Sequence, residues 1–321
     1  MTRRTLKLAT LMLGLNLGAL AVVSVVLFVG TYLTAQRAVD MAMERTFAQR
    51  HKVAELLIRD CLNLIAGEVS VLAGQQATIE AVARRDKAVL ERSLSSLYEH
   101  ESDCHIDILF VADAQGRPWV DVSAARVSTQ TIPARFVGTG QAEEAWRLVE
   151  GSGPGDPTAA FVTSRPVVSD WDGGLVGEVY AGILFNNNLA LTRAIRRASG
   201  ADTIGIVYRG QVIADSERRS SEALEVMRRT ALDHPHGTIS RSGDLLLAGR
   251  PLDVAGAGPA LSIVQSFPNE AFAALRADYR NTAVVLVLAV LTAALLVVLV
   301  MRRATLPALG RLVAYANSVQ S

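Results

Sequence analysis

The sequence has little of what marks an enzyme or a nucleic-acid-binding protein. It contains two cysteines among 321 residues, and 32 basic against 31 acidic side chains leave a formal net charge of +1. Nucleic-acid binding relies on a clear excess of positive charge, so this balance argues against such a partner. The G-x-S-x-G, P-loop, H-E-x-x-H and C-x-x-C patterns are all missing from the sequence. We therefore expect neither catalysis nor a bound cofactor from this chain.

Charge is also missing from two long apolar runs, Leu8 to Leu33 and Thr282 to Met301. A helix needs about 20 apolar residues to cross the hydrocarbon core of a membrane, and both runs reach that length. The alternative for the first run is a cleaved signal peptide. The run is long for a signal peptide, and no clear cleavage site follows it. We predict transmembrane helices over residues 8–33 and 279–301.

Basic residues set the expected orientation of these two helices. They gather just before the first run and just after the second: Arg3, Arg4, Lys7, Arg302, Arg303 and Arg311. Positive residues are retained on the cytoplasmic side of a membrane. We therefore expect a multi-pass protein of the inner membrane with both ends in the cytoplasm and residues 34–281 in the periplasm.

Between the two runs, the polar and apolar residues first follow a helical period. One long helix is predicted from Ala35 to Leu64, loosening near Gly67 and Gly74, and a second helical stretch from Gln76 to Tyr98. A long helix that rises from a membrane either pairs with a copy in a second subunit or packs on its own domain. Both arrangements can hold at once, and a homodimer is the expected assembly.

After Tyr98 the residue pattern becomes typical of β-strands. Hairpins are predicted around the turn at Ala114–Arg117 and around Asp170–Gly174, with a mainly helical piece from Pro133 to Glu150 and a helix from Leu189 to Ser199. The same order of segments occurs twice, because three stretches return later in shortened form. They are Asp107–Asp121 with Asp202–Asp215, Ser164–Val167 with Gly249–Leu252, and Phe185–Asn188 with Phe267–Glu270. A tandem α+β repeat with antiparallel sheets is therefore predicted.

This arrangement resembles the double Cache sensor region of bacterial transmembrane receptors. The resemblance lies in the long helix after the first span, the hairpin through Ile108–Gly116, the segment Arg165–Gly182 and the shorter second copy. The segment from Arg302 onward, with Pro307 in it, is similar to the first helix of a HAMP linker. The order predicted is a cytoplasmic start (1–7), a span (8–33), helices (34–98), a membrane-distal Cache module (99–199), a membrane-proximal one (200–278), a span (279–301) and a HAMP-like helix (302–321).

The resemblance implies a dimeric receptor that binds a small ligand in its membrane-distal module and relays the change through the second span. The output domain would be a histidine kinase, a chemotaxis domain or a nucleotide cyclase. Polar or aromatic residues in the first copy are the candidate ligand contacts: Trp119, Asp121, Arg126, Arg165, Asp170 and Tyr180. Arginine suits a ligand carboxylate and aspartate an amine. An alternative function is docking of a periplasmic binding protein, with no small ligand of its own.

Several of these candidates have a structural alternative. Trp119 and Tyr180 equally suit a core, and Arg165 has a counterpart in Arg250 of the second copy, which indicates a structural role. Asp170 with Asp172 favours a solvated turn over a cation site. His234 and His236, which flank a proline, favour a loop over a metal pair.

The two cysteines, Cys61 and Cys104, both fall in the predicted periplasmic segment. An oxidising compartment permits a disulfide between them. Spacing does not decide the matter, and two buried free thiols are the alternative.

Overall fold

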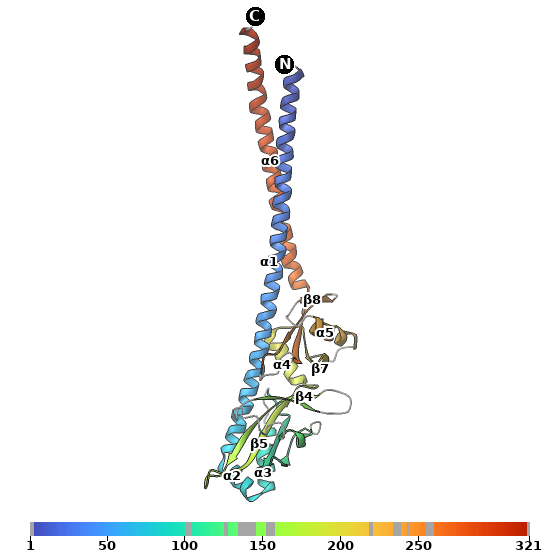
Figure 1. The fold of residues 1–321 in the computed structure, drawn as a ribbon. Coiled ribbons are helices and arrows are strands. Elements are labelled where there is room, and N and C mark those ends of the chain that lie inside the picture. Colours follow the sequence, from blue (N-terminus) through green and yellow to red (C-terminus); the bar gives the residue numbers. More distant parts are fainter. Residues whose placement is uncertain are drawn as a thin grey trace. The chain divides into compact units, whose positions relative to one another are not determined.

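A computed structural model describes residues 3–99, 104–124, 128–133, 146–151, 158–217, 221–233, 239–242, 244–254 and 260–319 (Figure 1). The chain divides into two compact units. One unit comprises Met1–Met43 with Glu270–Ser321, and the other comprises Glu44–Asn269. The second unit holds both sheets and therefore the candidate site.

The first helix is longer than the sequence predicted. Helix α1 covers Arg3–Gly74 and passes Gly67 without a break. Within the unit of sheets, one face of α1 is buried at Ala54, Ile58, Ile65 and Val69, which recur at the spacing of a helical stripe. Burial of this stripe outweighs the cost of about 1 kcal/mol of a glycine inside a helix.

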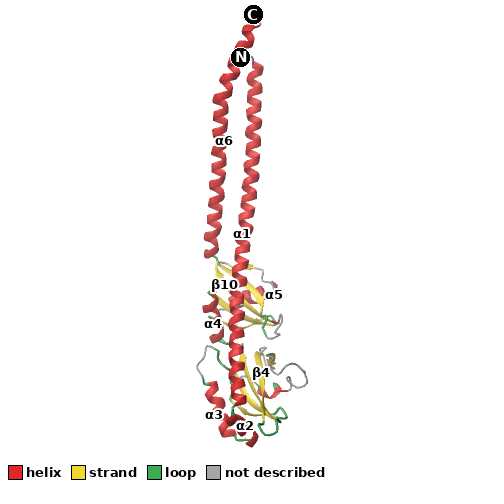
Figure 2. Cartoon of the chain, turned by 90° about the vertical axis from the view of Figure 1, so that its left-hand side faces the viewer, coloured by secondary structure: helices red, strands yellow, loops and turns green. Residues whose placement is uncertain are grey.

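The stretch predicted as one helix from Gln76 to Tyr98 is instead two helices, α2 (Gln76–Arg84) and α3 (Lys87–Tyr98). Arg85 ends α2 in the left-handed conformation, with a φ of 56°. The Asp86 carboxylate then caps α3 by accepting a hydrogen bond from the Val89 amide at 3.2 Å. The break separates α2 from α3 (Figure 2), and α3 contacts strands β1 and β2 of the first sheet.

The first sheet has the strand order β2-β1-β5-β4-β3, and every neighbouring pair is antiparallel. Its strands are β1 (Ile108–Asp113), β2 (Pro118–Asp121), β3 (Arg147–Gly151), β4 (Thr158–Val168) and β5 (Leu175–Leu184), with the short 3-10 helix η1 (Thr129–Thr131) after β2. Both predicted hairpins are present. Strand β3 lies where a helix was predicted up to Glu150, and residues 134–145 lie outside the described residues. We call this sheet with α2 and α3 the first module.

The second sheet repeats that order as β7-β6-β10-β9-β8. Its strands are β6 (Thr203–Tyr208), β7 (Gln211–Asp215), β8 (Ile239–Ser242), β9 (Leu245–Pro251) and β10 (Leu261–Pro268). Each strand corresponds in position to one of the first sheet, which confirms the α+β class with a duplicated antiparallel sheet. We call this sheet with its helices the second module.

Two helices pack on the second sheet, α4 (Leu189–Ser199) and α5 (Ser221–Asp233). Helix α4 has the bounds that the sequence predicted. The Asn188 side chain caps its start by accepting from the Leu191 amide at 2.9 Å, and Gly200 ends it in the left-handed conformation.

After β10 the chain enters helix α6 (Glu270–Val319). Two described segments, Val22–Gly74 of α1 and Phe272–Val297 of α6, are long and apolar enough to cross a membrane.

Candidate functional site

The first sheet has two chemically different faces. Residues that pair across neighbouring strands point to the same face, and successive residues alternate between faces. Arg165 pairs with Val179, whereas Ser164 pairs with Tyr180 and Tyr180 with Phe110. Arg165 and Tyr180 therefore lie on opposite faces. We call the face that carries Tyr180, Phe110 and Ser164 the Tyr180 face.

The face that carries Arg165 packs against helices. The Arg165 Nε donates to the Ser70 hydroxyl of α1 at 2.7 Å, and its Nη1 donates to the Ser164 carbonyl at 2.9 Å. On the same face, a Cβ placed on Gly177 would lie 3.0 Å from the Val82 side chain of α2. Arg165 is 9% exposed and belongs to the packing of α1 on the sheet.

The Tyr180 face has an aromatic centre. The rings of Phe110 and Tyr180 stack in parallel with their centroids 4.7 Å apart, and both side chains are buried. Ile132 and Val149 are among the apolar side chains that pack with them. These groups form an apolar wall on this face of the sheet.

Polar groups sit beside this wall. The Tyr180 hydroxyl donates to the Glu178 carboxylate. Burial, and then this hydrogen bond, raise the pKa of Tyr180, while the positive charge of Arg147 acts in the opposite direction. Arg147 pairs with Val162 on this face. A cation, a carboxylate and a phenol thus share one face of the sheet.

Two more predicted residues lie at the β2 edge of this face. Asp121 pairs with Phe110, and its carboxylate accepts from the Thr129 hydroxyl at 2.6 Å and from the Ser123 amide at 2.9 Å. The register shifts opposite Val111 and Ala112, so Trp119 is the extra residue of a bulge and is half-buried. The structure therefore groups Trp119, Asp121 and Tyr180 on one sheet.

The other predicted contacts are elsewhere. Asp170 is exposed in the β4–β5 turn, where the neighbouring Asp172 carboxylate accepts from the Gly174 amide at 3.0 Å. That hydrogen bond lowers the pKa of Asp172. Arg126, like His234 and His236, lies outside the described residues.

Arg147 and Glu178 were missed by the sequence analysis. Arg147 fell in a stretch predicted to be helical, which hid its strand alternation with Val149. Glu178 carried a usable signal, because it stands two residues before Tyr180 in a predicted strand and must share its face.

The second sheet carries different residues at the positions that correspond to the Tyr180 face. The row Phe110, Tyr180 and Ser164 corresponds to Gly205, Val264 and Gly249 in the second sheet. A Cβ on Gly205 would lie 2.7 Å from the Met227 sulfur, and one on Gly249 would lie 3.2 Å from the Ala231 Cα. Both neighbours belong to α5, so this helix packs directly on the sheet.

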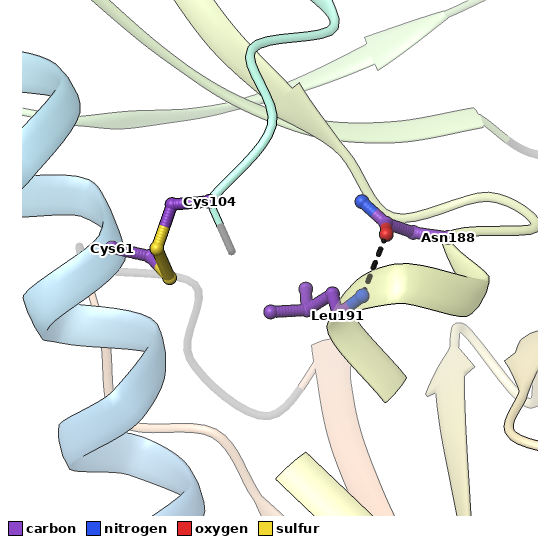
Figure 3. Close-up of a disulfide and its surroundings, with 4 residues drawn as sticks. All are labelled: Cys61, Cys104, Asn188 and Leu191. Atoms are coloured by element: carbon purple, nitrogen blue, oxygen red, sulfur yellow. Dashed lines mark hydrogen bonds between the residues drawn. A yellow bond between two sulfur atoms is a disulfide. The ribbon is translucent and has the colours of Figure 1, made fainter. Parts of the chain in front are cut away.

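A disulfide fixes the approach to β1. Cys61 of α1 and Cys104 are bonded, with the sulfur atoms 2.02 Å apart (Figure 3). Three residues later, the Asp107 carboxylate accepts from the Leu184 amide at 2.9 Å, and burial raises the pKa of Asp107. The bridge therefore ties α1 to the strand that carries Phe110.

Comparison with known proteins identifies the family. A family model described as "LuxQ, periplasmic" matches residues 35–275. The autoinducer 2 sensor kinase/phosphatase LuxQ of Vibrio cholerae is 25% identical over 179 residues, which are 54% of this chain and 20% of that protein. This chain therefore spans about a fifth of that relative's length.

Solved structures agree on the fold. A crystal structure of the Vibrio cholerae LuxQ periplasmic domain is similar with a TM-score of 0.59 and 18% identity, covering 69% of this chain and 99% of that one. A second crystal structure of that domain gives a TM-score of 0.58, with 70% and 98% covered. The predicted likeness to receptor sensor domains is confirmed, while the HAMP-like helix stays a prediction. The chain belongs to the LuxQ periplasmic family, and its matched region is a periplasmic sensor domain of a membrane receptor, not a catalytic domain.

Proposed function

We propose that the first module senses a small molecule that carries both a carboxylate and an amine. The observation that carries this proposal is the polar cluster on the Tyr180 face. Arg147 would pair with the carboxylate, Glu178 would accept from the amine, and the Phe110–Tyr180 wall would hold the apolar part. The Glu178 and Tyr180 groups already form a hydrogen bond, so a ligand amine would share an ordered carboxylate.

Contrast with the second module supports the choice of the first. In the second module, helix α5 packs against Gly205 and Gly249 at the corresponding positions. Its neighbours there are the buried apolar residues Val207, Leu247 and Val264. The side chains of these three described residues are apolar, whereas specific pockets need a few placed polar groups.

The test is a thermal-shift screen of the detergent-solubilised chain against amino acids, amines, carboxylates and sugars. Autoinducer 2 belongs in the screen because the Vibrio cholerae relative is named for it. A zwitterionic hit should raise the melting temperature of the wild-type chain, because it binds only the folded state. Arg147→Gln should abolish that rise.

Arg117→Gln is the matched control. Arg117 is an exposed arginine of the same module, in the β1–β2 turn, and its ion pair is with Asp113. It should keep the full response to the ligand. If no compound stabilises the wild-type chain, or if Arg147→Gln responds normally, direct sensing at this face is wrong.

In the proposed receptor, the two apolar helices would carry the ligand-induced change across the membrane. The proposed receptor is a homodimer in the inner membrane, with 8–33 and 279–301 as its spans, residues 34–281 in the periplasm and the HAMP-like helix at 302–321. Its modules would be residues 99–199 and 200–278. A ligand shifts such a receptor by binding one arrangement better than the other, typically by about 1–3 kcal/mol.

Docking of a periplasmic binding protein is the second candidate. The observation that favours it is Trp171, which is 96% exposed in the β4–β5 turn, next to the exposed pair Val168 and Leu175. Exposed tryptophans are common anchors of protein interfaces. Trp171→Ala should reduce capture of a periplasmic protein by the immobilised chain while Trp171→Phe retains it. Equal capture by both variants would remove this support.

A further inference from the structure

The disulfide lies at the wall of an open groove. Cys61 and Cys104 both line this groove, which has a volume of about 880 Å³. Helix α4, which carries the labelled Leu191, forms the wall opposite α1 (Figure 3). Small-molecule sites in proteins typically have volumes of about 300–1,000 Å³. The bridge is therefore next to a space large enough for a small molecule.

The two cysteines of the bridge differ in their exposure to solvent. Cys61 is 3% exposed and lies on the buried side of α1, between Ile58 and Ile65. Cys104 is half-buried and precedes β1, outside any helix or strand. A molecule in the groove thus has better access to the bridge at Cys104 than at Cys61.

The groove also carries one positive and one negative side chain. Arg197, near the end of α4, and Asp60, on α1, are both exposed and both line it. Apart from these two residues and the cysteines, the described residues that line the groove are apolar. An arginine pairs well with a carboxylate, and an aspartate accepts hydrogen bonds from an amine. The groove thus presents a disulfide beside a pair of opposite charges.

We infer that the Cys61–Cys104 bridge is a site of thiol–disulfide exchange, and that its reactant is a small thiol that also carries a carboxylate and an amine. The carboxylate pairs with Arg197, the amine with Asp60, and the thiol sulfur lies at the bridge. Exposed disulfides are in general the reducible and regulatory ones. This inference does not rest on the ligand proposed for the Tyr180 face.

The exchange consumes two thiol molecules. The thiolate of the first attacks the Cys104 sulfur and forms a mixed disulfide, while the bond to Cys61 breaks. Cys61 leaves as a thiolate and takes up a proton from water. A second thiolate attacks the sulfur of the first thiol and releases Cys104, which is protonated in the same way. The bridge has then gained two electrons, and the two thiols have become one disulfide.

Reduction removes the covalent link between α1 and the segment that leads into β1. Strand β1 carries Phe110 of the Tyr180 face, and α1 continues without a break over Arg3–Gly74. The redox state of the bridge therefore sets how firmly this strand is held to the long helix. The chain responds to thiols at a site separate from the Tyr180 face.

Reduction of the detergent-solubilised full chain by glutathione tests this inference. Labelling with a maleimide and measuring the mass counts the thiols that have formed at each time. Arg197→Gln should slow the reaction about threefold, which is the size of effect that an exposed ion pair can have. Reduction by 2-mercaptoethanol, which is uncharged, should proceed in this variant as in the wild type.

Arg193→Gln is the matched control. Arg193 is exposed on the same helix one turn earlier, and it is not among the described residues that line the groove. This variant should react like the wild type with both thiols. Equal rates for Arg193→Gln and Arg197→Gln with glutathione overturn the inference.

A second measurement separates attack through the groove from attack on the unfolded chain. In 1 M urea the unfolded population rises about fivefold or more, so a bridge that reacts only after unfolding is reduced faster by that factor. Attack on the folded chain should leave the rate nearly unchanged. A rate that rises with the unfolded population, or a bridge that glutathione leaves intact, overturns the inference.

Discussion

Arginine side chains on strands of this protein serve different purposes according to the face they occupy. Arg165 is directed at Ser70 of α1, and its counterpart Arg250 precedes Pro251, whose carbonyl accepts from His51 of α1 at 3.0 Å. In each module, the strand that carries this arginine thus lies next to α1. Arg147 lies on the Tyr180 face of β3, opposite Val162. Arg165 and the Pro251 carbonyl thus each bond to α1, whereas Arg147 shares a face of its sheet with Tyr180.

Arg165→Ala is predicted to destabilise the fold. It removes charged hydrogen bonds from a buried position, which is expected to cost about 2–3 kcal/mol. Arg117→Ala, at an exposed position of the same module, should change stability by less than about 1 kcal/mol. Urea unfolding followed by circular dichroism measures both. A loss of the ligand response without a loss of stability in Arg165→Ala would instead make Arg165 a binding residue.

The buried Asp107 carboxylate makes stability depend on pH. Burial raises its pKa, while the Leu184 amide and the charge of His105 act in the opposite direction without reversing it. The folded state therefore holds the Asp107 proton to higher pH than the unfolded chain, whose pKa is near 3.9. The neutral Asp107 side chain therefore adds to the free energy of unfolding below that pH. This added stability is lost as the pH rises through the pKa of Asp107 in the folded state.

Asp107→Asn should remove this part of the pH dependence. The Asn oxygen still accepts from the Leu184 amide, but it carries no charge to bury. We expect the variant to gain stability relative to the wild type as the pH rises from 4 to 7, measured by urea unfolding at each pH. A wild-type and a variant curve that stay parallel over this range would show that the Asp107 charge costs nothing.

At the level of elements, the same sheet is finished in two ways. The first module presents Phe110 and Tyr180, and the second presents glycine at two of the three corresponding positions and receives α5. Glycine fits at position 205 because a Cβ there would lie only 2.7 Å from the Met227 sulfur. Small residues on this row of the second sheet thus make room for α5, whereas the corresponding row of the first sheet carries two stacked aromatic rings.

Gly205→Ala tests this packing. The added methyl group meets Met227, which is itself buried, so the variant should lose about 1–3 kcal/mol of stability. Met227→Ala alone should lose about 2–5 kcal/mol by leaving a cavity. The double variant should lose less than the sum, because the methyl group then occupies vacated space. Denaturant unfolding of the four chains gives the coupling energy, and strict additivity would contradict the packing described.

At the level of the whole molecule, the order of the helices and strands could be predicted from the sequence. The face of the sheet on which each side chain lies could not. The two charge-free runs and the repeated segments gave the helices, the hairpins and the duplicated sheet, because composition and period act locally. The faces depend on register between strands distant in sequence. That is why Arg165 was nominated together with Tyr180, although the two lie on opposite faces. Glu178 could have been found from strand alternation alone, and β3 was taken for a helix. The break at Arg85 was missed because its left-handed conformation leaves no mark in the residue type.

The disulfide is a constraint on the whole molecule, and the sequence left it open against two free thiols. Cys61 and Cys104 are 43 residues apart, and the loop between them contains α2 and α3. Closing a loop of that length restricts the unfolded chain and contributes up to about 4 kcal/mol. The double variant Cys61→Ala and Cys104→Ala should lose about 2–4 kcal/mol in urea unfolding, and the wild-type chain with dithiothreitol should lose a similar amount. Dithiothreitol should leave the double variant unchanged, since it has no bond to reduce. If the wild-type chain is equally indifferent to the reductant, the bridge does not form in the protein, and packing alone holds α1 against the strand that carries Phe110.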